Sequence, residues 1–517
     1  MKKYIAIFSA AILALSLYSC SDEAFDVQST STLSGSAAAK IVEQNPDFLS
    51  AYVNGFYAWL VQYNQAGNSG HDDYGHLAIG AITDLMGQDI AINGSWNWGK
   101  YDINHDYGRW DWSRPYQLWN CYFTLIKNAN EVIDFFGEED PVNPVLRGYL
   151  GQAYALRAFS YYYLVQLFQD VAEGSYPNAT FNTSAPAVPV IYAVRDGKTT
   201  DEVTAMSGRN TIADICTEIE RNIALALPLL KDYERSTKNE VDYSVAQGFA
   251  ARYYLLSQQW DKAISAADEA MAGYTLMDNA RLHAGFKEIE DPEVMWGFNH
   301  TSETQTTYAS FFSHLSNDNY GYGGIGQSVH CIDVSLYSKI SDTDYRKSLF
   351  NGPDGDANAA YSGGKLPYAG RKFGGDANYL QDYTFMRAAE MYLIKAEAEA
   401  RMNGTSTTLA TLMAKRDPSW NKTANLEEVL LQRRIELWGE GFEYFDLRRL
   451  AKDVDRTYDG SNHSTQGKYK FPAHAKSWNF QIPQREIQNN NYITEEENNE
   501  WITGPEEFAT DDEGSGE

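Results

Sequence analysis

Cysteine is scarce in this sequence, with four residues in 517. Cys121, Cys216 and Cys331 are widely separated, and none belongs to a C-x-x-C pair. The spacings typical of structural zinc sites and redox disulfides are therefore absent, and we predict neither a disulfide framework nor a metal site. Cys216 shares a helical face with Ile212 and Ile219, which indicates a buried, inert thiol.

No apolar run is long enough to cross a bilayer, which needs roughly 20 residues. The longest lies at the N-terminus, where Lys2 and Lys3 precede the apolar stretch Ile5–Leu17, as in a signal peptide. This stretch runs into Leu17-Tyr18-Ser19-Cys20, which resembles a bacterial lipobox. We expect residues 1–20 to be a lipoprotein signal and Cys20 to carry the lipid anchor. The alternative is an ordinary secretory signal followed by a chance cysteine.

Basic residues are also few: the sequence has 42 lysines and arginines but 70 acidic residues, so its net charge is −28. Such a surface repels nucleic acid and anionic lipid headgroups, so we predict no nucleic-acid partner. The polar residues 21–36 are expected to be a flexible leader, and the acidic residues 504–517 a solvated tail. The expected folded body is residues 37–503.

Motifs that would announce an enzyme are missing: there is no G-x-S-x-G, no H-E-x-x-H and no P-loop. Gly321–Gly326 formally fits G-x-G-x-x-G, but it lacks the apolar strand before it and the helix after it that dinucleotide binding requires. Asp354–Asn358 begins like a calcium loop, yet Ala359 replaces the turn glycine and Lys365 the final glutamate. We therefore predict no cofactor. A glycosidase carboxylate pair stays open because acidic residues are abundant.

Helical periodicity is what the sequence does contain. Helices are expected over 47–59, 76–86, 115–136, 145–168 and 207–230. The segment 246–272 reads as a helical hairpin of tetratricopeptide type, with Ala251, Tyr254, Ala263 and Ala270 at the repeat's small and aromatic positions. The predicted fold class is mainly α.

Two segments lack this periodicity and are rich in aromatic residues, namely 67–112 and about 277–381. Long irregular segments inside a compact protein usually carry function. The flat face of a sugar stacks on aromatic rings, and its hydroxyls need hydrogen-bond partners. The candidate ligand residues are Trp96, Trp98, Tyr101, Tyr308, Tyr320 and Tyr322. The alternative is that these rings fill a core that lacks regular structure.

The most informative stretch is 432–450, QRRIELWGEGFEYFDLRRL. Apolar residues at helical spacing lead to Trp438, where Gly439 and Gly441 break the helix before a second short one. Both signs of charge lie beside these apolar residues, so we expect buried ion pairs. On physical grounds alone, this is a structural helical hairpin.

This hairpin also resembles the C-terminal signature of the SusD/RagB family of nutrient-binding outer-membrane lipoproteins. Three further segments support the resemblance in the expected order: 156–191, with LRAFSYYYLVQLFQDV and PAVPVI; 389–401, AEMYLIKAEAEAR; and 480–490, FQIPQREIQNN. Gln169, Glu443 and Asn491 depart from the family pattern, and these departures concern the subfamily.

The resemblance implies several helical hairpins that form a curved scaffold. It also implies a non-enzymatic protein, lipid-anchored to the outer membrane and exposed at the cell surface. Such a protein captures an oligosaccharide and delivers it to a SusC-like TonB-dependent transporter. Three alternatives remain: capture of peptides, a surface glycoside hydrolase and a purely structural repeat scaffold.

Overall fold

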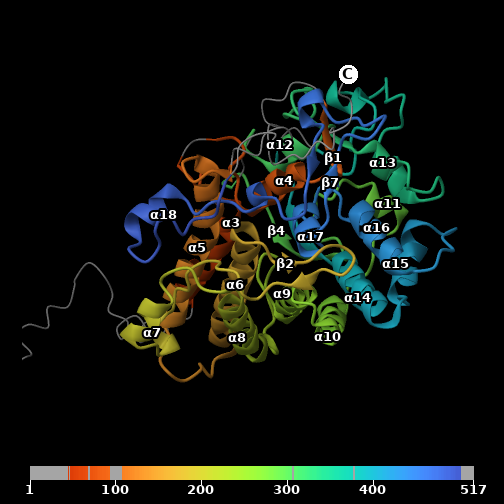
Figure 1. Ribbon diagram of the computed structural model, residues 1–517. Helices are drawn as coiled ribbons and strands as arrows, with labels where there is room; N and C mark the ends of the chain where they lie inside the picture. The colour runs from red at the N-terminus through yellow and green to blue at the C-terminus, as the bar shows by residue number, and fades with distance from the viewer. Residues whose placement is uncertain are drawn as a thin grey trace, which may run out of the picture.

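The computed structural model describes residue 45 and residues 47–67, 70–93, 108–304, 308–375 and 379–501 (Figure 1). Helices dominate this part of the chain. The longer ones are α3 (Asp47–Val61), α4 (His76–Met86), α5 (Ser113–Asp134), α6 (Pro144–Phe168), α8 (Ile212–Leu230), α9 (Tyr243–Leu256), α10 (Trp260–Met271), α14 (Ala388–Asn403) and α16 (Leu426–Glu436). The shorter ones are α7 (Thr200–Ala205), α11 (Asn279–Leu282), α12 (Phe311–Leu315), α13 (Val334–Tyr337), α15 (Thr408–Arg416), α17 (Glu443–Arg449) and α18 (Gln484–Asn489).

The strands are short and form antiparallel pairs. They are β1 (Ile90–Asn93) with β5 (Val329–Ile332), β2 (Ala172–Glu173) with β3 (Thr180–Phe181), β4 (Val294–Phe298) with β6 (Tyr383–Arg387), and β7 (Val454–Asp455) with β8 (Lys470–Phe471). The prediction of a mainly α fold is confirmed.

Local sequence signals explain where the helices begin. The side chain of Asn143 accepts hydrogen bonds from the amides of Val145 and Leu146, and Pro144 occupies the first position of α6. The predicted helix 207–230 starts later than expected, at Ile212 in α8. Thr211 and Asp214 form a capping box there, which defines the first turn.

The long helices pack side by side. Figure 1 shows α6, α8, α9, α10 and α14 across the lower half of the molecule, while α4, α12, β1 and α13 lie in the upper half. Successive contacts join α5 to α6, α6 to α8, α9 to α10, and α10 to α14. The predicted hairpin corresponds to α9 and α10, where Ala251, Ala263 and Ala270 are fully buried and allow the two backbones to approach closely. The tetratricopeptide-like interpretation of this segment is confirmed.

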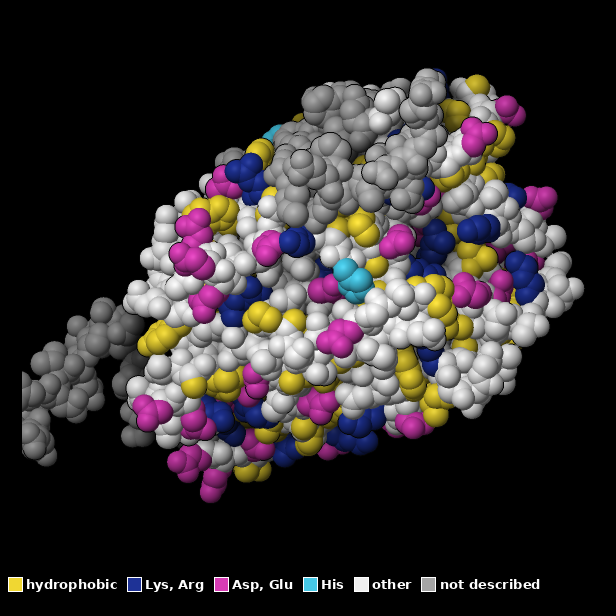
Figure 2. Space-filling view, in the orientation of Figure 1, with side chains coloured by type: hydrophobic (Ala, Val, Ile, Leu, Met, Phe, Trp, Pro, Cys, Tyr) yellow, Lys and Arg dark blue, Asp and Glu magenta, His cyan; other side chains and the backbone are white. Residues whose placement is uncertain are grey.

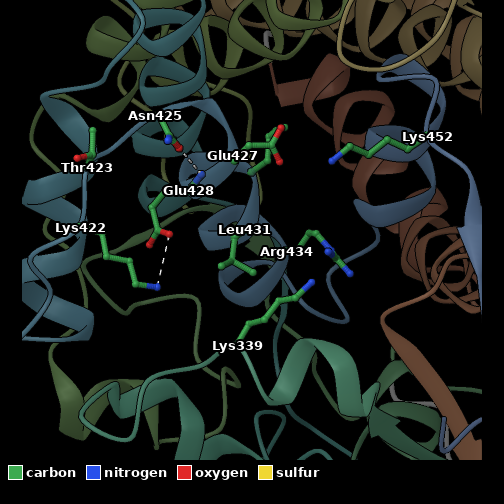
Figure 3. A pocket seen from close by; sticks show the side chains of 10 residues that line it. Lys339, Lys422, Thr423, Asn425, Glu427, Glu428, Leu431, Arg434 and Lys452 are labelled. Carbon is green, nitrogen blue, oxygen red and sulfur yellow. Dashed lines mark hydrogen bonds and ion pairs between the residues drawn. The ribbon is translucent and has the colours of Figure 1, made fainter. Parts of the chain in front are cut away.

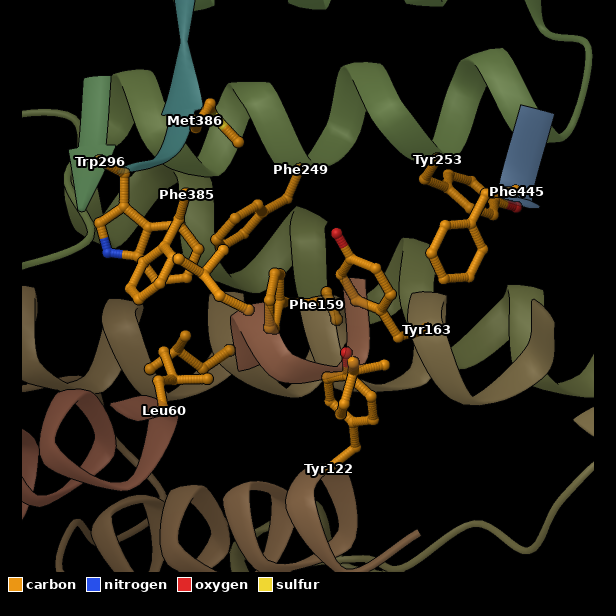
Figure 4. Packing of buried hydrophobic residues seen from close by; sticks show 14 of the residues in the cluster. Leu60, Tyr122, Phe159, Tyr163, Phe249, Tyr253, Trp296, Phe385, Met386 and Phe445 are labelled. Carbon is orange, nitrogen blue, oxygen red and sulfur yellow. The ribbon is translucent and has the colours of Figure 1, made fainter. Parts of the chain in front are cut away.

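An aromatic core joins these helices to the pair of strands β4 and β6 (Figure 4). The buried ring of Trp296 on β4 lies edge-on to Phe159 of α6, with 5.3 Å between ring centroids. It also contacts Phe249 of α9 at 5.2 Å and Phe385 of β6 at 4.8 Å. The segment 277–381 therefore contributes a strand to the hydrophobic core, although most of it is irregular.

The predicted hairpin at 432–450 consists of α16 and α17, joined by a tight turn. Gly439 and Gly441 have φ angles of 73° and 84°, in the left-handed region that favours glycine. A Cβ atom on Gly441 would lie 2.7 Å from the Cα of Gly80 in α4, so this contact also requires glycine. Trp438 is 2% exposed, and its indole N–H donates to the carbonyl of Asp89 over 2.9 Å. The turn thus fastens the C-terminal hairpin to α4 and β1.

Buried ion pairs surround this hairpin, as expected. The carboxylate of Glu436 accepts hydrogen bonds from Arg346 at 3.0 Å, Arg387 at 2.7 Å and Arg416 at 2.9 Å. Arg387 and Arg416 also bind Glu293, at 2.6 and 3.1 Å. Although burial acts in the opposite direction, the three guanidinium groups hold the pKa of Glu436 well below its usual range. Removing one member would leave an unpaired buried charge, so the network holds the segments that contribute to it together.

Cys121, Cys216 and Cys331 are buried and free. Cys216 is buried as predicted, and burial raises the pKa of its thiol to about 12. Within the described ranges, no helix is long and apolar enough to span a membrane.

Candidate ligand-binding site

Three of the six predicted aromatic residues lie together near α12. The ring centroid of Tyr308 is 6.4 Å from that of Tyr320 and 5.7 Å from that of Tyr322. Tyr308 is 37% and Tyr320 53% exposed, whereas Tyr322 is only 8% exposed. Two rings can therefore contact a ligand, and the third lies beneath them. We call this group the tyrosine cluster.

The other predicted site residues cannot be placed in this way. Trp96, Trp98 and Tyr101 lie outside the described residues, and so does Cys20. Their roles in ligand binding and lipidation stay predictions.

A glycine-rich turn after α12 positions Tyr320 and Tyr322. A Cβ atom on Gly321 would lie 2.6 Å from the Cα of Ser313, and one on Gly324 would lie 1.7 Å from the carbonyl oxygen of Asn319. These glycines permit the turn to fold tightly against itself and against α12. This is the structural role of the G-x-G-x-x-G pattern. The element that follows it is the strand β5, whereas a dinucleotide site would have a helix there.

Two histidines support the tyrosine cluster from below. His71, in the loop between α3 and α4, bonds through Nδ1 to the hydroxyl of Tyr322, and its ring is nearly parallel to that of Tyr308. The ring of His314 in α12 lies 5.0 Å from that of Tyr322, and its Nε2 donates to the carbonyl of His71 over 3.1 Å. Burial lowers the pKa of His314 to about 4, so this imidazole is neutral at neutral pH. These contacts hold Tyr322 in place before any ligand arrives.

Tyr379 lies near the tyrosine cluster, although the sequence did not single it out. Its side chain is 9% exposed, and its hydroxyl has no hydrogen-bond partner within the described part of the chain. Burial and the nearby phenols of Tyr308 and Tyr320 raise the pKa of Tyr379 to about 12. Its φ of 53° is rare for a tyrosine. Aromatic density in segment 277–381 was the available signal, but it did not separate Tyr379 from other tyrosines.

A phenol hydroxyl can both donate and accept hydrogen bonds. A hydrogen bond with Tyr320 raises the pKa of Tyr308. Hydroxyl groups that converge beside exposed rings suit a ligand with apolar faces and many hydroxyls.

An ion-paired arginine lies in the same segment. Arg371 binds Asp318 at 2.6 Å and Asp356 at 3.1 Å. Asp356 also accepts from the amide of Asn358 at 2.9 Å, so the calcium-like run serves as a turn. Among the described residues, no group of three or more histidine, cysteine or acidic side chains could hold a metal ion.

Comparisons with known proteins agree with this architecture. Residues 364–501 match the family model described as "SusD family", and residues 50–255 match one described as "Starch-binding associating with outer membrane". SusD-like protein P2 of Formosa agariphila is 23% identical over 395 residues, which are 64% of this chain and 71% of that protein.

Solved structures share the fold. A SusD-like carbohydrate binding protein from Bacteroides vulgatus superposes with a TM-score of 0.71 at 22% identity, covering 88% of this chain and 98% of that one. Surface glycan-binding protein A from Bacteroides thetaiotaomicron gives a TM-score of 0.61 at 18% identity, covering 86% and 99%. Because the two family models match both the N-terminal helices and the C-terminal hairpin, the chain belongs to the SusD/RagB family.

Proposed function

We propose that this protein captures oligosaccharides through the tyrosine cluster and has no catalytic role. The observation that carries the proposal is the arrangement of Tyr308 and Tyr320, which are exposed, over Tyr322, which is buried and hydrogen-bonded to His71. Two structural neighbours are described as binding carbohydrate or glycan, and one matching family as starch-binding.

The physical basis is stacking combined with hydrogen bonding. The exposed rings offer apolar faces to a pyranose, and the phenol hydroxyls offer donors and acceptors to its hydroxyl groups. The unpartnered hydroxyl of Tyr379 gains a partner if a sugar hydroxyl reaches it. Trp96, Trp98 and Tyr101 are proposed to add further stacking.

The test is a glycan-array screen followed by calorimetry with a glycan that binds. Loss of one stacking ring is worth roughly 1–2 kcal/mol, so Tyr320→Ala should weaken binding about 5- to 30-fold. Tyr492→Ala is a suitable control, because this tyrosine is 52% exposed and lies near α18. Trp96→Ala and Trp98→Ala are expected to act like Tyr320→Ala.

The same experiments separate the alternatives. Unchanged affinity in all these variants, with the protein still folded, would show that the ligand binds elsewhere. Shortened glycan products after incubation with the purified protein would indicate a hydrolase. Binding of peptides but no glycans would favour the peptide-capturing alternative.

We further propose that Cys20 anchors the protein at the outer-membrane surface, where it delivers glycan to a SusC-like TonB-dependent transporter. A permanent complex requires an interface on the order of 2,000 Å² or more. The protein extracted in mild detergent should therefore co-purify with an outer-membrane barrel protein. Recovery as a monomer alone would contradict the delivery role.

A further inference from the structure

A hollow lies beside α16, and its lining includes none of the residues of the tyrosine cluster (Figure 3). Its volume is about 480 Å³, within the range of roughly 300–1,000 Å³ that small-molecule sites occupy. The lining includes Lys339, Lys422, Arg434 and Lys452. We call it the basic hollow.

Positive charge predominates in this hollow, although the whole chain carries −28. Four basic side chains face only two acidic ones, Glu427 and Glu428. Figure 2 shows dark blue side chains gathered in the region that α13 and α16 occupy in Figure 1. A positively charged hollow on an otherwise acidic protein attracts ligands that carry anionic groups.

Two of the four cations are already paired within the protein. The guanidinium of Arg434 binds the carboxylate of Asp89, with 2.9 Å between Nε and Oδ2. The ammonium of Lys422 lies 3.6 Å from Glu428. Arg434 is nevertheless 29% exposed at its side chain, so part of it still faces the hollow.

The other two cations have no such partner. Among the described residues, neither Lys339 nor Lys452 forms a side-chain hydrogen bond or a close ion pair, although Glu427 lies near enough to attract the ammonium of Lys452. In Figure 3 the side chain of Lys339 extends from below toward Arg434, and that of Lys452 extends from the right toward Glu427. They come from different parts of the chain, next to α13 and α17, so they face a common space because of the fold.

Lys452 is the more informative of the two because it is half-buried. Its ammonium lies 3.9 Å from the ring centroid of Tyr176, whose hydroxyl donates to Glu427. Burial lowers the pKa of Lys452. Desolvation of this ammonium costs free energy that the attraction of Glu427 offsets only in part, because the pKa stays lowered, and a bound anion would offset more of it.

The rest of the lining is suited to hydroxyl groups. The amide NH₂ of Asn425 and the hydroxyl of Thr423 have no side-chain donor role elsewhere among the described residues, and both line the hollow. The carboxylate of Glu427 can accept from a ligand hydroxyl. A ligand that combines an anionic group with several hydroxyls matches this set of partners.

From this geometry we propose that the basic hollow binds the carboxylate, sulfate or phosphate group of an acidic saccharide, with Lys339 and Lys452 contacting the anion and Arg434 completing the positive field. This inference rests on the proposed glycan-binding function and narrows the ligand to acidic glycans. It adds a second contact point to the tyrosine cluster.

The test compares matched probes by calorimetry with the purified protein. The probes are a galacturonic acid trisaccharide, a sulfated chondroitin disaccharide and a neutral galactose trisaccharide, each at low and at high sodium chloride. Lys339→Gln combined with Lys452→Gln should weaken binding of the acidic probes about tenfold or more, because two charge-assisted contacts are lost. Lys127→Gln is the matched control, since this exposed lysine of α5 lies outside the lining of the hollow and is paired with Glu131. It should change affinity less than about threefold.

Salt gives an independent readout. Binding of the acidic probes should weaken at high salt, and binding of the neutral probe should not. Thermal melts show whether each variant is folded; if the double variant is not, the single Lys339→Gln variant replaces it, because Lys339 is exposed.

Several results would overturn the inference. These are equal affinity for acidic and neutral probes, unchanged binding of acidic probes by the double variant, and inorganic sulfate binding as tightly as the acidic sugars. Tighter binding of poly-glutamate than of any acidic sugar would assign the hollow to an acidic peptide instead. Failure of the general function is distinguishable, because binding of neutral glycans depends on Tyr320 and not on the two lysines.

Discussion

Truncation of Trp438 to alanine is expected to destabilise the protein strongly without altering ligand affinity. The indole is 2% exposed and lies edge-on to Phe350, with 4.9 Å between centroids. A Cβ atom on Gly370 would lie 2.5 Å from the indole, so the ring fills its site closely. Tryptophan-to-alanine changes in such cores cost about 3–5 kcal/mol.

The expected change in melting temperature follows from the size of the chain. Unfolding entropy is about 2.1 cal/mol/K per residue, or roughly 1 kcal/mol/K for 517 residues. A loss of about 4 kcal/mol should therefore lower the melting temperature by about 4 °C. The carbonyl of Asp89, which accepts from the indole, would also lose its donor.

The assay is chemical denaturation and calorimetric melting of the wild type and two variants. Trp438→Phe keeps most of the ring but loses the N–H, so its loss should be smaller than that of Trp438→Ala. Tyr492→Ala truncates an exposed ring and should cost less than about 1 kcal/mol. A loss below about 1.5 kcal/mol for Trp438→Ala, or a large drop in glycan affinity at unchanged stability, would refute the structural role of this residue.

Three further substitutions test other features. Burial raises the pKa of Asp84 to about 7, although the amides of Gly441 and Glu443 donate to it. Because the ordinary pKa of this carboxyl is 3.8, the folded state binds a proton between about pH 4 and 7 that the unfolded state has lost, so stability falls as pH rises through that window. In denaturation curves, Asp84→Asn should reduce the pH dependence of the unfolding free energy by up to about 1.4 kcal/mol per pH unit. An identical pH dependence in both proteins would exclude this titration. Tyr322→Phe removes the hydroxyl that His71 holds and should weaken glycan binding about 3- to 10-fold in calorimetry; full affinity would mean that this hydrogen bond does not position the cluster. Cys20→Ala should abolish lipidation and membrane association in fractionation experiments, and the variant's retention in outer membranes washed with high salt, without a transporter to hold it, would contradict the single anchor.

The helical scaffold could be predicted from sequence because its signals are local. The period of 3.6 residues identified α4 and α6 to within a residue, and Gly439 and Gly441 located the turn between α16 and α17. The resemblance of that hairpin to a family signature then allowed the helical scaffold of the rest of the chain to be predicted.

The binding site could be predicted only in part. The hydrogen bond between His71 and Tyr322 joins residues 251 positions apart, and no local pattern in a single sequence indicates that these two loops meet. Tyr379 was missed for a similar reason, because its placement depends on an unusual φ angle and on neighbours from other segments. Strand β4 was missed because a five-residue apolar run is too short to distinguish from a buried turn.

The pairing of β4 with β6 and of β5 with β1 has a consequence for how specificity can change. The stretch 299–328, which carries Tyr308, Tyr320 and Tyr322, begins and ends at strands that are fixed in the body of the protein. It can therefore be replaced between relatives as a cassette, much as hypervariable loops are exchanged on an antibody framework. Grafts that keep Phe298 and Val329 as boundaries should preserve the fold and transfer glycan preference, whereas cuts at Glu293 or Arg346 would sever the buried charges around Glu436.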